Sequence, residues 1–285
     1  MLALKRLWSV IWRVLVFLVG WAILCVPFTI PVLIKYAPNG ALPLGLRLYI
    51  ESVTLVAILI SAWLMLRFFD RRPFVTLGFA RHHAVRDSLF GLIIGLGMMT
   101  ACFAILYFCG WTKPNTSGAF SGSALELATL AMILNTASQE VMVRGYVQQT
   151  IEGRFGLLSG VIGSAVFFLA LHLGAIQGAI LPAVSLFAAG ILLGTCYAVS
   201  GNLWLPLALH FGWNYMQGPV LGLTVSGQTL DSGWRLFKLI GPPLMTGGKF
   251  GVEGGVIAIF ITILGTPIVL FAFRSHRIQT ATSMA

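Results

Sequence analysis

Three apolar segments of the chain carry polar side chains of the kinds that catalyse hydrolysis. The first contains Glu140 and Arg144, the second contains His172, and the third contains His210 and Asn214. A carboxylate or an imidazole can take a proton from water, while an imidazole and an amide can donate hydrogen bonds to a developing oxyanion. Together these side chains predict a site for general acid–base hydrolysis.

The spacing within the first and third segments is four residues, which puts both members of each pair on one helix face. An ionisable group at membrane depth costs about 2.5–3.5 kcal/mol on insertion scales, so each one needs a partner or a wet cavity. Taken singly, each group has a structural interpretation, as an ion pair that fixes helix register or as a hydrogen bond between helices. The combination favours a site, and we expect these segments to hold nearly all the ionisable groups inside the bundle.

The elements that position these residues must be membrane helices. The chain has 285 residues, of which 58% are hydrophobic and 9% are charged, with a mean hydropathy of +0.93. A soluble domain carries roughly a quarter charged residues, so a soluble enzyme, a disordered chain and a secreted disulfide scaffold are excluded. We predict an all-α fold, a polytopic membrane bundle of about eight transmembrane helices. The predicted spans are 12–34, 50–68, 88–111, 124–150, 156–176, 179–199, 203–223 and 252–273.

The basic residues report the topology of the chain. Lys and Arg are more numerous on the side of the N-terminus, above all in the loop 67–87, which predicts that both termini are cytoplasmic. The net charge of +10 is therefore a topology signal, and we expect the lipid bilayer and no nucleic acid as a partner. We predict an integral protein of a bacterial plasma membrane.

The three polar segments, in this order, resemble the motifs of the CPBP family. These are the CAAX-protease and bacteriocin-processing intramembrane endopeptidases, also called the Abi or type II CAAX family. The family motifs are Glu-Glu-x-x-x-Arg, Phe-x-x-x-His and His-x-x-x-Asn, and the matching residues here are Gln139, Glu140, Arg144, Phe168, His172, His210 and Asn214. The resemblance covers about residues 80–265. It implies N-terminal membrane helices at 1–80, a CPBP-like catalytic membrane domain at 81–273 and a cytoplasmic tail at 274–285.

The resemblance also implies a role for each matching residue. A motif-one glutamate and His172 would activate a water molecule for attack on the scissile carbonyl. His210 and Asn214 would stabilise the oxyanion, and Arg144 would hold the carboxylate in place. The expected function is endopeptidase activity on a membrane-associated protein or peptide.

One position departs from the family pattern. The first of the two family glutamates is the one usually assigned as base, and this chain has Gln139 there. An amide does not accept a proton at neutral pH. Either Glu140 serves as the base, although adjacent helical side chains point about 100° apart, or the chain has lost peptidase activity.

Two alternatives to a peptidase follow from the same residues. A catalytically inactive CPBP homologue would act in bacteriocin immunity or as a membrane scaffold, and Gln139 is the feature that favours it. An ion-coupled transporter would use the Glu and His side chains as a proton relay, but no repeated halves support it.

No cofactor is favoured by the sequence. The metalloprotease label of the family leaves zinc as an alternative, with Glu140, His172 and His210 as ligands and a fourth position open. No His-Glu-x-x-His helix is present, and the three ligands would come from three separate helices. We therefore expect base catalysis without a metal.

Overall fold

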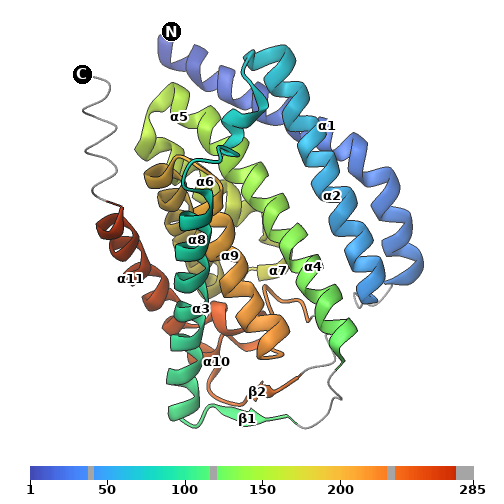
Figure 1. Ribbon diagram of the computed structural model, residues 1–285, viewed down its shortest axis with the longest axis vertical. Coiled ribbons are helices and arrows are strands. Elements are labelled where there is room, and N and C mark those ends of the chain that lie inside the picture. Colours follow the sequence, from blue (N-terminus) through green and yellow to red (C-terminus); the bar gives the residue numbers. More distant parts are fainter. Residues whose placement is uncertain (38–41, 116–120, 230–234, 274–285) are drawn as a thin grey trace.

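A computed structural model describes residues 1–37, 42–115, 121–229 and 235–273. The chain is a bundle of helices (Figure 1). Its longer helices are α1 (Leu2–Tyr36), α2 (Leu44–Leu64), α3 (Ala84–Phe108), α4 (Gly122–Glu140), α6 (Leu157–Leu171), α8 (Ile180–Ser200), α9 (Trp204–Tyr215) and α11 (Val256–Ala272). Shorter helical segments are η1 (Met65–Asp70), η2 (Phe74–Leu77), η3 (Val141–Gln148), α5 (Gln149–Phe155), α7 (Leu173–Ile176), η4 (Met216–Val220), α10 (Pro243–Thr246), η5 (Gly248–Phe250) and η6 (Val252–Gly254).

The helices agree with the predicted all-α membrane bundle. Every predicted span overlaps a helix. Four helical segments are long and apolar enough to cross a membrane, namely Leu2–Tyr36, Leu44–Asp70, Ala84–Phe108 and Ile180–Ser200. The helices α6 and α11 are apolar but shorter, so the figure of eight spans stays a prediction. A small antiparallel pair, β1 (Thr112–Pro114) with β2 (Phe237–Leu239), closes the end of the bundle opposite the N-terminus (Figure 1).

The helix α9, which carries His210, is fixed by close contact with α3. A Cβ atom on Gly91 would lie 2.4 Å from the carbonyl oxygen of Leu205, and one on Gly95 would lie 2.2 Å from that of Leu209. Both distances are too short for any side chain, so the two backbones touch where only glycine fits. Such close contact of small residues is expected where the hydrophobic drive between helices is weak.

The first polar segment lies on a helix that changes its winding. Helix α4 ends at Glu140 and continues without a break as the π-helix η3. All eight residues of η3 are buried. Single π turns inside α-helices are often found at functional sites. Glu140 and Arg144 therefore lie on a segment that the rest of the bundle encloses.

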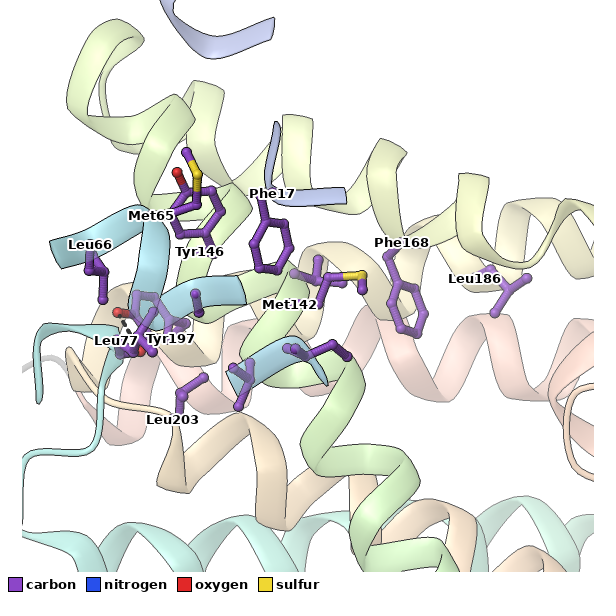
Figure 2. Packing of buried hydrophobic residues seen from close by; sticks show 14 of the residues in the cluster. Phe17, Met65, Leu66, Leu77, Met142, Tyr146, Phe168, Leu186, Tyr197 and Leu203 are labelled. Carbon is purple, nitrogen blue, oxygen red and sulfur yellow. Dashed lines mark hydrogen bonds between the residues drawn. The ribbon is translucent and has the colours of Figure 1, made fainter. Parts of the chain in front are cut away.

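A large hydrophobic cluster supports this enclosed segment. In Figure 2, Tyr146, Phe17, Met142 and Phe168 follow one another across the cluster, and they come from helices far apart in the chain. The rings of Phe17 and Tyr146 stack at a centroid separation of 4.6 Å. The same cluster includes Phe168, so the packing that holds the bundle together also holds the helix turn that precedes His172.

The predicted division of the chain remains a prediction. Helix α2 packs on α4, and so the N-terminal helices adjoin the segment predicted to be catalytic. The predicted cytoplasmic tail, residues 274–285, lies outside the described residues.

Candidate active site

The polar side chains of the bundle meet at a cavity of about 400 Å³. Its walls come from α2, α4, α6, α8, α9 and α11 and from the loops beside them. Four of the predicted site residues border it, namely Gln139, His172, His210 and Asn214. The other polar residues of its lining are Arg47, Glu51, Asn135, Ser185, Trp213, Ser226, Gln228, Glu253 and Thr262.

The two imidazoles reach this cavity from different helices and share one neighbour. His172 follows the last residue of α6, and its ring centroid lies 4.7 Å from that of Phe168. His210 lies in α9 and meets the same phenyl ring edge-on at 5.8 Å. The two histidines, 38 positions apart in the sequence, thus border one cavity.

The hydrogen bond of His172 fixes which ring nitrogen is available. Its Nδ1 lies 2.8 Å from the carbonyl oxygen of Phe168. A carbonyl oxygen only accepts, so Nδ1 must carry the hydrogen of this bond. In the neutral ring Nε2 then has a free lone pair. His172 is therefore prepared to accept a proton or a hydrogen bond through Nε2.

Glu140 lies behind His210 and does not border the cavity. Its Oε1 accepts a hydrogen bond from Nη1 of Arg144 at 3.0 Å and lies 2.8 Å from Nδ1 of His210. The Glu140 and Arg144 side chains are fully buried. A carboxylate at Nδ1 orients the ring, in the manner of other carboxylate–histidine pairs. Glu140 is thus placed to act through His210.

Several atoms of this cluster have no hydrogen-bond partner within the described residues. They are Oε2 of Glu140, Nε of Arg144 and Oε1 of Gln139. Arg144 is otherwise held by the carbonyl oxygen of Gly190, 3.2 Å from its Nη2, and by the Phe168 ring, 4.7 Å from its Cζ. Buried polar atoms are nearly always paired, so a group of unpaired ones calls for a functional reason.

Gln139 faces the cavity that Glu140 does not reach. Its Nε2 donates to Oδ1 of Asn135 at 2.9 Å, and Nδ2 of Asn135 donates to Oε2 of Glu51 at 3.1 Å. Adjacent helical positions point about 100° apart, which explains why Gln139 and Glu140 face different environments. The residue at the position of the usual base therefore brings an amide to the cavity.

Two carboxylates of the cavity lining were missed by the sequence analysis. Glu51, from α2, and Glu253, from η6, both border it, so the expectation that three segments hold nearly all the buried ionisable groups was wrong. Both residues lie inside predicted spans, at 50–68 and 252–273. The signal that could have found them is an acidic residue within an otherwise apolar span. Such a carboxylate has the same insertion cost in lipid as that of Glu140 and therefore also needs a reason.

The predicted alternative zinc ligands do not fit a metal site. Within residues 1–37, 42–115, 121–229 and 235–273, no three His, Cys, Asp or Glu side chains are grouped as metal ligands. Glu140 contacts Nδ1 of His210 through Oε1 and does not border the cavity, so its carboxylate does not share one metal-binding point with the Nε2 atoms of the two histidines. Three zinc ligands must instead direct their donor atoms at one point.

Comparison with known families supports the resemblance found in the motifs. The family model described as type II CAAX prenyl endopeptidase Rce1-like matches residues 121–216. This range includes all three motifs and confirms the likeness to the CPBP family. It leaves out α1 to α3, α11 and Glu253. Comparisons with curated proteins and with solved structures gave no match.

Proposed function

We propose that this chain is an intramembrane endopeptidase that hydrolyses a peptide bond of a membrane-associated protein or peptide. The observation that carries the proposal is the meeting of His172, His210 and Asn214 at one cavity. In both rings Nδ1 is engaged, by Phe168 or by Glu140, which leaves both Nε2 atoms for substrate and water. The matched family is a family of proteases.

The proposed reaction uses water as the nucleophile. Nε2 of His172 accepts a hydrogen bond from the water and orients it, and a basic group of the cavity wall takes its proton as the oxygen attacks the carbonyl carbon. His210, oriented by Glu140, and Asn214 donate hydrogen bonds to the oxyanion. The proton then passes to the leaving amine, and the carbon–nitrogen bond breaks.

In this proposal Glu140 and Arg144 are positioning residues. Glu140 fixes the ring of His210, and Arg144 compensates the charge of Glu140 where no water reaches it. Direct abstraction of a proton from water by Glu140 would need His210 to move, because the imidazole lies between the carboxylate and the cavity. This account retains Glu140 as essential while it explains why the residue is fully buried.

The proposal is tested with purified protein in lipid vesicles. Internally quenched peptides carrying an S-farnesyl cysteine near the C-terminus, and the same peptides without the lipid, serve as substrates. We expect cleavage by the wild type and a loss of at least 100-fold in Glu140→Gln, because the amide removes the negative charge that contacts both Arg144 and His210. Unchanged turnover in a folded Glu140→Gln protein would end this mechanism.

A second candidate is favoured by one observation, the amide of Gln139 at the cavity wall. An inactive homologue would keep the cavity as a binding site, in immunity to a bacteriocin or as a scaffold. It would cleave none of the peptides, and the phenotype of cells that depend on it would survive Glu140→Gln. The peptidase proposal requires the opposite result in both measurements.

We also propose that both termini lie in the cytoplasm and that the β1–β2 end of the bundle faces outward. The start of α1 and α5 share one end, where Nε of Arg154 donates to Oγ of Ser9 at 3.2 Å. Cys109 follows α3 at the other end and is exposed, whereas Cys25, Cys102 and Cys196 are buried. A membrane-impermeant maleimide should therefore label intact cells only when Cys109 is present. Labelling that needs permeabilised cells would reverse the proposed orientation.

A further inference from the structure

Two carboxylates, Glu51 and Glu253, border the cavity, and they have different neighbours. Glu51 is hydrogen-bonded to Asn135 and interacts electrostatically with Arg47, four residues earlier on α2. Glu253 interacts electrostatically with His210. The groups that act on Glu51, namely Asn135 and Arg47, include neither histidine. Glu253 is therefore the better placed of the two for chemistry at the histidines.

The local structure holds Glu253 in a defined position. Its Oε1 accepts hydrogen bonds from both the main-chain N–H and the Oγ–H of Ser226, the latter at 2.6 Å. These two donors act on Oε1, and the indole of Trp213 also interacts with the carboxylate. Oε2 is the oxygen that Ser226 does not contact. A side chain fixed through one oxygen can exchange a proton at the other.

The turn that carries Glu253 depends on glycine. Gly251 has a φ of +105°, and a Cβ there would lie 2.0 Å from the carbonyl oxygen of Thr224. A Cβ on Gly255 would lie 2.2 Å from the carbonyl oxygen of Met245. The chain on both sides of Glu253 is thus pressed against neighbouring backbone, which brings this carboxylate to the cavity rather than to the lipid.

We propose that Glu253 is the base of this site and supplies the carboxylate that Gln139 lacks. This inference rests on the peptidase function proposed above and names the proton acceptor in it. Oε2 of Glu253 takes a proton from the water that Nε2 of His172 holds, while the water oxygen bonds to the carbonyl carbon. The same proton then goes to the leaving nitrogen, so Glu253 is regenerated as a carboxylate and no other reactant is consumed.

The test uses the full-length protein in vesicles and the peptide that the wild type cleaves best. Glu253→Gln keeps an oxygen that can accept the hydrogen bonds of Ser226 but does not take up a proton. We expect its kcat to fall about 10²- to 10⁴-fold, with KM and the unfolding temperature close to those of the wild type. The matched control is Glu126→Gln, an exposed position on α4, which should leave kcat unchanged.

A second variant, Gln139→Glu, restores the carboxylate at the family position. If Glu253 had only a structural role, this substitution would not rescue the Glu253→Gln protein. In the Glu253→Gln protein, adding Gln139→Glu should raise kcat at least tenfold, because a carboxylate then lies at the family position on the cavity wall. A folded Glu253→Gln protein with kcat within threefold of the wild type would overturn the inference alone. Failure of Gln139→Glu to restore any activity would also overturn it. Absence of cleavage by the wild type would overturn the proposed function as well.

Discussion

Two acid–arginine clusters in the bundle, one partly buried and one fully buried, differ in how completely their atoms are paired. In the first, which we call the Asp70 cluster (Asp70, Arg13 and Tyr146), Nε of Arg13 donates to Oδ1 of Asp70 at 2.9 Å and the Tyr146 hydroxyl donates to Oδ2 at 3.2 Å. In the second, which we call the Glu140 cluster (Glu140, Arg144 and His210), Oε1 of Glu140 has two partners and Oε2 has none within the described residues.

We interpret this difference as a structural role for the Asp70 cluster and a role in the proposed reaction for the Glu140 cluster. The Asp70 cluster uses both oxygens of its carboxylate, and it joins α1, η1 and η3 at the end of the bundle that contains the N-terminus. The Glu140 cluster leaves polar atoms unpaired beside a cavity, at a cost that packing does not explain. A buried network with unpaired members is retained when its groups serve another purpose, here the orientation of His210.

The largest effect expected from this comparison is on stability. Arg144→Met removes the guanidinium partner of the fully buried Glu140 carboxylate, which costs about 3–5 kcal/mol. Arg13→Met breaks a pair whose side chains are 15% and 11% exposed, and water can replace part of what is lost. We expect a smaller loss of about 1.5–3 kcal/mol there. Unfolding in mixed detergent micelles measures both, and equal losses would remove the distinction between the clusters.

The next largest effect is on kcat, and it is tested by comparing substitutions of two buried asparagines, Asn214 and Asn202. Asn214 borders the cavity, and Asn214→Ala should lower kcat about 10²- to 10³-fold through loss of an oxyanion donor. Asn202 is also buried, but its Nδ2 donates to Oδ2 of Asp87 at 2.6 Å, away from the cavity. Asn202→Ala should therefore lower the unfolding free energy and leave kcat unchanged. A similar loss of kcat in both variants would mean that folding, not oxyanion binding, is being measured.

The smallest effect concerns one hydrogen bond of the Asp70 cluster. Tyr146→Phe removes the hydroxyl that donates to Asp70 and keeps the ring that stacks on Phe17. We expect a loss of about 1 kcal/mol in unfolding free energy and unchanged peptide cleavage. A tenfold loss of cleavage would show that this cluster also takes part in the reaction.

The sequence predicted the helices and the convergence of three motifs, but not the direction of each side chain. Hydrophobic runs in lipid predict helices directly, because backbone groups must be paired within the segment. Motif spacing placed Glu140 beside Arg144, as found. It did not predict which of Gln139 and Glu140 faces the cavity, because that depends on how α4 packs and on the π turns that follow it.

The carboxylates that were missed illustrate the same limit. Glu51 and Glu253 lie 202 positions apart in the sequence, and neither belongs to a motif. They meet at the cavity only because α2 packs on α4 and because the glycines around Glu253 permit close backbone approach. Contacts of this kind follow from tertiary packing, which spacing along one helix does not report.

The central claim is that the cavity bordered by His172, His210 and Asn214 hydrolyses peptide bonds. The most direct measurement is the initial rate of peptide cleavage in vesicles by the wild type and by His172→Gln, with Tyr146→Phe as a folding-matched control. The account predicts that His172→Gln loses at least 100-fold, while Tyr146→Phe cleaves like the wild type. Equal cleavage by the wild type and a folded His172→Gln protein would contradict it.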